Sequence, residues 1–281
     1  MIGAIASFSA MAIAGRELGP RFDTFEIMMY RSAFGVSVVV VLVFATGAWH
    51  QIKTRNIGQQ LVRNLAHFTG QNLWFYAVTV IPLAQVFALE FTSPLWVIVL
   101  SPLILGERLT LVRGIAAIMG FIGILIVARP SIEGINAGVI AAATSAIFFA
   151  LTIMFTKRLT RTQTITGILF YLTTMQLVFG LVAAGYDGDI AAPDARSLPF
   201  LALIGICGLL AHYCLTNALS VAPATVVVPI DFVRLPVIAV LGMLLYKEAL
   251  DVWVFVGAAV IFAGNYLNIW FETRRSVAKG P

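Results

Sequence analysis

The 281-residue chain is 60% hydrophobic and only 11% charged, with a formal net charge of +5. Soluble globular domains carry about 25% charged residues, whereas apolar runs of membrane-spanning length follow one another here from end to end. This composition excludes a soluble domain and indicates an integral membrane protein. The basic residues lie between the apolar runs and form no patch with interleaved aromatics, so nucleic acid is excluded as a partner.

The apolar runs predict an all-α membrane protein with ten transmembrane helices. Turn-forming residues separate most of them, but the links at Pro82 and Pro223 are almost absent, so the helices on either side must form tight hairpins. No basic residue precedes the first run, which argues for a helix and against a signal peptide. The predicted helices cover residues 1–16, 23–46, 60–80, 82–105, 110–129, 134–157, 164–185, 197–219, 223–246 and 251–272.

The fourth helix has an unusual sequence. It opens at Pro82, contains Pro94 where a helix should break, and carries the carboxylate of Glu90 at a depth where hydrocarbon is expected. The same pattern returns 141 residues later, where Asp231 matches Glu90 and Glu248 matches Glu107 without a gap. One unit therefore occurs twice, and each copy has a buried acid.

The 141-residue shift also matches Tyr30 with Tyr171 and Phe121 with Phe262, so it extends over nearly the whole chain. We expect two repeats, residues 1–132 and 133–281, of five helices each. An odd number of crossings makes the second repeat enter the membrane from the opposite face. Inverted repeats of this kind build transporters with a site near the midplane, between the halves.

The distribution of Lys and Arg predicts the orientation. With a cytoplasmic N-terminus, the inner loops and ends carry eleven basic residues and the outer ones five. Because basic residues concentrate on the cytoplasmic side, both termini are expected in the cytoplasm, in a multi-pass protein of the inner membrane.

Several motifs resemble those of the drug/metabolite transporter superfamily, in its ten-helix EamA-domain family. They lie in both halves: R-S-A-F-G from Arg31, F-T-S-P-L-W from Phe91, L-G-E-R from Leu105, G-F-I-G-I-L-I-V-A-R-P from Gly120 and P-I-D-F-V-R-L-P from Pro229. The resemblance implies a metabolite carrier, often an exporter of amino acids or related compounds, with a cavity between the halves. One departure is that the second copy has Tyr246-Lys247-Glu248, where the family often has a glycine before the glutamate.

Four charged residues lie within the apolar runs: Arg31, Glu90, Asp231 and Arg234. Each costs ~3 kcal/mol to place in a membrane unless it finds a partner, water or a function. Asp231 and Arg234 have i, i+3 spacing and can pair, so Asp231→Asn is expected to leave Arg234 as an unpaired cation. This pair either fastens its helix or forms a polar floor to a cavity. Glu90 needs a partner from another helix, Arg31 or Arg234, or else holds a proton that drives transport.

A second group of candidates lies on the third and eighth helices. His67, Gln71 and Trp74 have i, i+4, i+7 spacing and share one helix face, and His212 matches Gln71 under the repeat shift. These residues either pack in the core or line a substrate cavity. On the sixth helix, the set Phe148, Phe149 and Thr152 is expected to add to the cavity wall.

Other residues are assigned to the scaffold. Glu107 and Glu248 end their helices and are expected to anchor them at the membrane surface. Four glycines, Gly120, Gly123, Gly257 and Gly264, should let helices five and ten pack closely, and the same two helices offer a surface for a homodimer. Cys207 and Cys214 would lie about 10 Å apart on one helix, too far for a disulfide.

The sequence therefore predicts a secondary carrier of small organic metabolites that works by alternating access, with a proton as the candidate coupling ion. A uniporter or exchanger without ion coupling is the runner-up. Two rival classes are a membrane enzyme, for which the sequence offers no nucleophile–base pair, and a structural subunit of a larger complex. No nucleotide-binding loop is present in the sequence, and no metal or other cofactor is expected.

Overall fold

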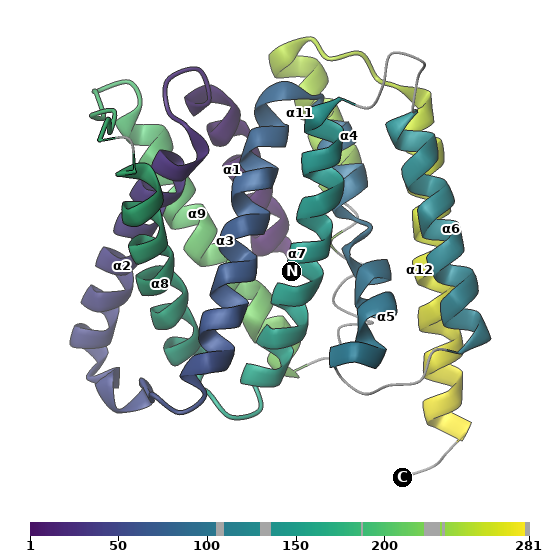
Figure 1. The fold of residues 1–281 in the computed structure, drawn as a ribbon, viewed down its shortest axis with the longest axis horizontal. Coiled ribbons are helices and arrows are strands. Elements are labelled where there is room, and N and C mark those ends of the chain that lie inside the picture. The colour runs from purple at the N-terminus through teal and green to yellow at the C-terminus, as the bar shows by residue number, and fades with distance from the viewer. Residues whose placement is uncertain (105–109, 130–135, 187, 222–230, 232–233, 279–281) are drawn as a thin grey trace.

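The computed structural model describes residues 1–104, 110–129, 136–186, 188–221, 231 and 234–278, and every regular element in those ranges is a helix. The helices pack side by side with their axes roughly parallel, as Figure 1 shows. They are α1 (Ile2–Leu18), α2 (Thr24–Thr46), the short 3-10 helix η1 (Ala48–Gln51), α3 (Ile57–Val80), α4 (Leu83–Glu90), α5 (Ser93–Ile104), α6 (Leu111–Ala128), α7 (Ala137–Leu159), α8 (Ile165–Ala184), α9 (Leu198–Val221), α11 (Arg234–Tyr246) and α12 (Val252–Ala278).

Each of the ten predicted ranges contains helical residues, and the fourth is broken as expected. Helix α4 ends at Glu90 and α5 starts at Ser93. Pro94 has no N–H to continue the ladder but is tolerated in the first turn of α5. The Ser93 hydroxyl donates to the carbonyl of Glu90 at 2.6 Å, which satisfies an acceptor that the break exposes. Only Ile81 and Pro82 separate α3 from α4, so this link is as short as expected, and the link at Pro223 lies outside the described residues.

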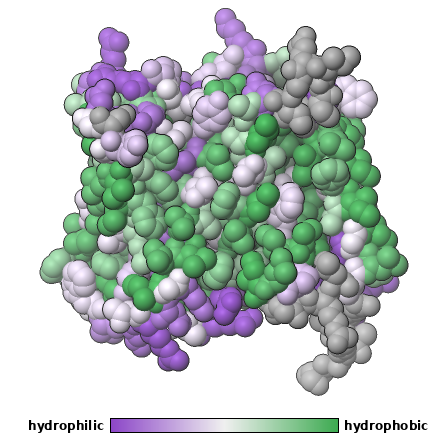
Figure 2. All heavy atoms as spheres, in the orientation of Figure 1, coloured by the Kyte–Doolittle hydropathy of each residue, from purple (hydrophilic) through white to green (hydrophobic). Residues whose placement is uncertain are grey.

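Six helical segments in the described ranges are long and apolar enough to cross a bilayer, and α6 and α11 are shorter apolar helices. Figure 2 shows the result on one face: a broad hydrophobic belt separates two hydrophilic ends. Helix α3 is less apolar because it carries buried polar side chains, among them Gln60, Arg63 and Asn64. Since these side chains face the protein interior, their polarity does not prevent α3 from lying within the belt.

Local capping explains where several helices begin. Asp23 and Glu26 form a capping box at the start of α2, in which each side chain accepts from the other residue's backbone N–H. The hydroxyl of Thr110 accepts from the N–H of Arg113 at the start of α6. The side chain of Asn136 caps α7, where it accepts from the N–H of Gly138. These caps satisfy N–H groups that a helix cannot satisfy itself.

The closest helix pairs join the two halves of the sequence: α1 with α9, α3 with α7, α2 with α8, and α6 with α12. The α6–α12 pair stands at one side of the bundle in Figure 1. The predicted close approach of these two helices is confirmed, because a Cβ on Gly123 would lie 2.8 Å from the carbonyl oxygen of Gly257. The glycines thus serve packing within one chain.

Glu248, which the sequence assigns to anchoring the end of its helix, has partners on two other helices. Its carboxylate pairs with Arg16 of α1 and accepts a hydrogen bond of 3.0 Å from the N–H of Leu83, the first residue of α4. Arg16 also donates to the carbonyls of Val78 and Ile81. The acid therefore joins α1, α4 and the end of α11, and its charged partner is Arg16 of α1. Glu107 lies outside the described residues.

Candidate functional site

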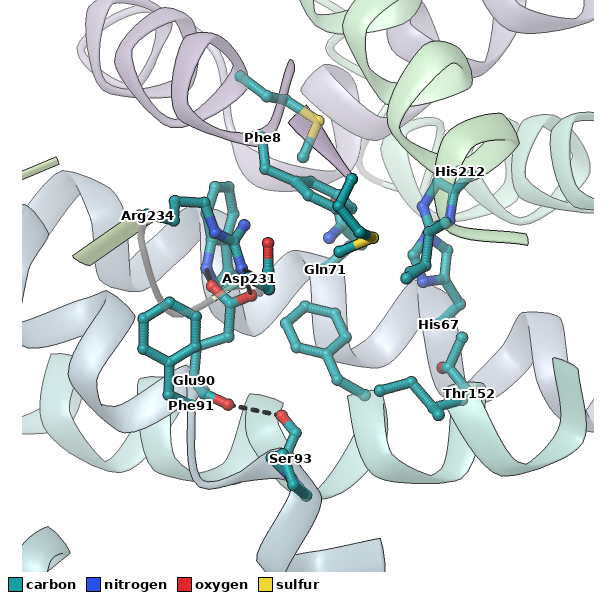
Figure 3. Close-up of a pocket in the computed structure, with 17 residues that line it drawn as sticks. Phe8, His67, Gln71, Glu90, Phe91, Ser93, Thr152, His212, Asp231 and Arg234 are labelled. Carbon is teal, nitrogen blue, oxygen red and sulfur yellow. Dashed lines mark hydrogen bonds and ion pairs between the residues drawn. The ribbon is translucent and has the colours of Figure 1, made fainter. Parts of the chain in front are cut away.

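A cavity of about 100 Å³ lies between the halves, and all but one of the predicted site residues line it. Figure 3 shows that Glu90, Asp231 and Arg234 gather at one end and His67 and His212 at the other. We call these two groups the acidic end and the histidine end. Gln71 and Trp74 also line the cavity. The exception is Arg31.

The acidic end is built around the guanidinium of Arg234. Its Nη2 donates to Oε1 of Glu90 at 2.8 Å and to Oδ2 of Asp231 at 2.6 Å. Asp231 is three residues before Arg234, whereas Glu90 is the last residue of α4. Two carboxylates thus share one guanidinium, and Oδ1 of Asp231 has no hydrogen-bond partner among the described residues. When both acids are ionised, this end of the cavity carries one surplus negative charge.

Aromatic rings enclose the Arg234 side chain, which is only 2% exposed. Its guanidinium carbon lies 4.7 Å from the ring centroid of Phe87, 4.8 Å from that of Phe8 and 5.3 Å from that of Phe91. Such cation–π contacts stabilise a guanidinium that has left water. Arg234 is therefore held from several sides and fixes the positions of both carboxylates.

Trp74 connects the two predicted groups of site residues. Its indole N–H donates to Oε2 of Glu90 at 2.7 Å, so each oxygen of this carboxylate has a partner. Helix α3 thereby positions the acid at the end of α4. The predicted cavity face of α3 accounts for this contact, because Trp74 follows Gln71 and His67 on that face.

The histidine end consists of two imidazole rings in edge-to-face contact. The ring centroids of His67 and His212 are 4.6 Å apart, with the planes at 85°. Both side chains are buried, yet neither ring nitrogen of His67 and not Nε2 of His212 has a hydrogen-bond partner in the described part of the protein. Oε1 of Gln71 is equally unsatisfied. Unsatisfied buried polar atoms that line a cavity are positioned to bind a ligand.

Arg31 lies away from the central cavity. It is buried, as the cost of a charge in hydrocarbon predicts, and its guanidinium packs against Gly208 of α9. Its one hydrogen bond within the described ranges is a 3.6 Å contact from Nη1 to Sδ of Met28. The structure thus separates Arg31 from Glu90, and Arg234 supplies the partner for that acid.

Several lining residues were not predicted from the sequence, including Phe8, Met11, Phe91 and Ser93. Phe149 and Thr152 line the cavity as expected, whereas Phe148 is not among the lining residues. The repeat shift contains the missing signal, since it carries Phe149 onto Phe8 and Thr152 onto Met11. Six pairs of lining residues are 141 positions apart: Phe8 and Phe149, Met11 and Thr152, Gln71 and His212, Trp74 and Leu215, Glu90 and Asp231, and Ser93 and Arg234.

Comparison with known proteins gives a consistent picture. The EamA-like transporter family matches residues 1–129 and 136–270. An S-adenosylmethionine uptake transporter of Rickettsia felis is 27% identical over 96% of this chain and 91% of its own length. A riboflavin transporter of Brucella anthropi is 28% identical over 94% and 95%. Another, of Rhizobium johnstonii, is 32% identical over 80% and 74%. Each of these three relatives is named as a transporter.

A solved crystal structure of a protein has a similar fold. It shares 17% sequence identity and superposes with a TM-score of 0.69, covering 97% of this chain and 96% of the other. At this identity the likeness concerns the fold alone. It extends over nearly the whole chain.

Proposed function

This chain belongs to the EamA-like transporter family, and from that premise we propose that it is a secondary carrier that moves a small organic metabolite by alternating access. The observation that carries this proposal is the cavity between the halves, with unsatisfied polar atoms at both ends. The family is a multi-pass membrane family, and relatives named as transporters favour a carrier over an enzyme or a structural subunit.

The proposed carrier consists of two inverted repeats, residues 1–132 and 133–281. The first support is the set of six lining pairs that share one sequence spacing. The second is a pair of matched contacts: Arg16 Nε donates to the carbonyl of Val78 at 2.5 Å, and Lys157 Nζ donates to that of Leu219 at 2.7 Å. Both donors and both acceptors are 141 residues apart. Two halves with the same contacts can exchange conformations, which alternating access requires.

The size of the cavity supports a conformational change. Its volume of about 100 Å³ is below the ~300–1,000 Å³ of typical small-molecule sites. A metabolite of more than a few heavy atoms therefore needs the surrounding helices to move apart before it enters. The break between α4 and α5, beside Glu90, offers a point at which such movement can take place.

For substrate and direction, the curated relatives favour uptake of a heterocyclic metabolite. Their names refer to S-adenosylmethionine uptake and to riboflavin, and both compounds contain a nitrogen heterocycle that the aromatic cavity wall would accept. The motif resemblance implied export of amino acids, which these names do not support. We therefore propose uptake, with these two compounds as the first substrates to test.

A proton is the proposed coupling ion, because two carboxylates share one guanidinium at the acidic end. Protonation of one acid would remove the surplus negative charge and change how firmly α4 and α11 are held together. The alternative is an uncoupled uniporter or exchanger. A pH gradient across proteoliposomes separates the two, since only the coupled carrier would concentrate substrate against its own gradient.

The decisive experiment is flux of labelled S-adenosylmethionine and riboflavin into proteoliposomes that contain the purified chain. Saturable uptake of either compound, absent from empty liposomes, is the expected result. Absence of flux for both would overturn the proposed substrate class.

We also propose that both termini are cytoplasmic and that the protein lies in the inner membrane. The motive is the excess of basic residues on that side. Reporter fusions after Pro281 test the orientation, and an active periplasmic phosphatase at this position would contradict it.

A further inference from the structure

We propose that the histidine end of the cavity is an anion subsite, which binds a carboxylate or phosphate group of the carried metabolite at His67 and His212. This inference rests on the proposed transport function and specifies one chemical feature of its substrate.

The two rings of the histidine end lack polar partners. Three of their four nitrogens have no hydrogen-bond partner among the described residues, although both side chains are at least nine-tenths buried. Their other neighbours are aromatic: His212 meets the edge of Phe8 at 5.9 Å, and His67 lies 6.3 Å from Phe149. Because aromatic rings cannot satisfy the imidazole nitrogens as well as a polar group does, a polar group of the ligand is the missing partner.

Two buried arginines lie close to the histidine end. Arg63 is one helical turn before His67 on α3, and the guanidinium of Arg31 packs against Gly208, one turn before His212 on α9. Arginine keeps its charge in protein interiors, so the histidine end lies in a positive field.

These cations have no counter-charge in the described ranges. Arg63 donates to Asn64 at 2.8 Å and to Thr156 at 3.1 Å, which are neutral acceptors. Arg31 contacts the sulfur of Met28. Neither guanidinium pairs with a carboxylate in the part of the chain that the structure describes. Two buried cations without an acid nearby favour the binding of an anion.

The charges at the acidic end of the cavity explain why an anion would bind at the histidine end instead. Nε and Nη1 of Arg234 also lack partners among the described residues, but two carboxylates contact the same guanidinium. An anion there would be repelled by Glu90 and Asp231, whereas His67 and His212 face the cavity from the side where the field is positive. The cavity thus orients a ligand by charge.

Two matched pairs of compounds test the inference by equilibrium binding to the purified full chain. S-adenosylmethionine is compared with its methyl ester, and flavin mononucleotide with riboflavin; each pair differs in one anionic group. We expect the anionic member of at least one pair to bind about tenfold more tightly, which is the gain of a charge-assisted hydrogen bond. In His67→Asn and His212→Gln the preference should fall below about threefold.

The third histidine gives a control. His50 lies in η1, is exposed and is not among the residues that line the cavity, so His50→Gln should keep the wild-type preference. Because the comparison of paired ligands is made first on the wild-type protein, it does not depend on the folding of any variant. Equal or tighter binding of the neutral members by wild type would overturn the anion subsite.

The flux experiment distinguishes this inference from the proposed function. If the chain transports a compound but binds the anionic members no more tightly than the neutral ones, the subsite is wrong and the carrier proposal stands. If the anionic member binds more tightly but none of the four compounds is transported, the carrier proposal is wrong and the subsite stands. If none of the four binds, the subsite and the proposed substrate class both fail.

Discussion

Arg234 and Glu90 are 144 residues apart in the chain, and their side chains are joined by a 2.8 Å ion pair from Nη2 to Oε1. The same nitrogen lies 2.6 Å from Asp231. The sequence suggested a pair of Asp231 and Arg234 in which loss of the acid would isolate the cation. In the structure Arg234 pairs with both Glu90 and Asp231, so loss of either acid alone does not leave the guanidinium unpaired.

Single neutralisation at the acidic end should be tolerated, and double neutralisation should not. In Glu90→Gln or Asp231→Asn the remaining carboxylate still pairs with Arg234, so each variant should lose about 1–2 kcal/mol of stability. The double variant leaves a buried cation without an acid and should lose more than the sum of the two, because an unpaired buried charge costs ~3–5 kcal/mol. Thermal and denaturant unfolding in detergent measure this cycle, and additive losses would contradict the shared pairing.

Glu90→Gln should also impair transport while it spares folding. The substitution removes the surplus negative charge of the acidic end and weakens the 2.7 Å hydrogen bond from Trp74. We expect reduced flux, or flux that no longer depends on pH, in proteoliposomes with protein of near-normal melting temperature. Normal transport at every pH would assign Glu90 a structural role only.

The glycines between α6 and α12 should not tolerate a methyl group. A Cβ at Gly123 would lie 2.5 Å from Cγ1 of Ile261 and 2.8 Å from the backbone oxygen of Gly257. Because a backbone oxygen cannot rotate away, Gly123→Ala should destabilise the protein by about 1–3 kcal/mol.

Gly114, on the same helix, is the matched control, since a Cβ there meets nothing within 4 Å. Gly114→Ala should be neutral or gain up to ~1 kcal/mol from helix propensity. Melting temperatures of the two alanine variants test this contrast. If both variants melted at the same temperature, the close packing of α6 on α12 would be wrong.

The two ion pairs of Arg16 and Arg21 should differ in strength. The Arg16–Glu248 side chains are 15% and 14% exposed, whereas those of Arg21 and Asp194 are 48% and 41% exposed. Arg16→Gln leaves a mostly buried carboxylate and should cost about 2 kcal/mol or more. Arg21→Gln should change stability by less than ~1 kcal/mol. Unfolding at low and high salt checks this, and equal losses would contradict the burial of the first pair.

The turn before α9 should contribute a pH-dependent stability. The Ser197 hydroxyl, then the Ser197 N–H, hold the pKa of the Asp194 carboxyl below its usual range, with Arg21 adding to the effect. A depressed folded-state pKa stabilises the protein above the unfolded value of about 4, and this stabilisation disappears as the pH falls through the folded value.

Ser197→Ala should therefore lower the melting temperature at pH 7, and its difference from wild type should shrink as the pH falls below about 4. Ser220 on α9 donates only to a carbonyl, that of Asn217, so Ser220→Ala is a control without this pH dependence. A constant difference between Ser197→Ala and wild type across the acid range would show that the carboxyl is not involved.

Sequence reasoning predicted the helices well because apolar length and turn residues act locally. Pro94 fixed the break between α4 and α5, and the i, i+4, i+7 spacing brought His67, Gln71 and Trp74 to the cavity. The position of Arg31 away from the cavity could not be predicted from such local patterns. Its separation from Glu90 depends on how α2 packs against α8 and α9, and no spacing within one helix contains that information.

The 141-residue repeat predicts more of the cavity-lining residues than the spacing within single helices does. Applied to Phe149 and Thr152, the shift of 141 residues would have placed Phe8 and Met11 in the cavity wall. Arg63 has no charged counterpart at that spacing, and its buried position became clear only from the contacts of α3 with α7. A symmetry in the sequence thus predicts the shared wall of the cavity but not the charges that make its two ends different.

The contacts of Glu248 affect the turnover rate of the proposed carrier as well as the stability of the fold. One carboxylate holds Arg16 and the first N–H of α4, and Arg16 in turn holds the carbonyls that end α3. A carrier that opened this face would have to break these bonds, because they join α1, the end of α3 and the start of α4 to the segment after α11. Substitutions at Glu248 would then change the turnover rate of the proposed carrier without touching the substrate.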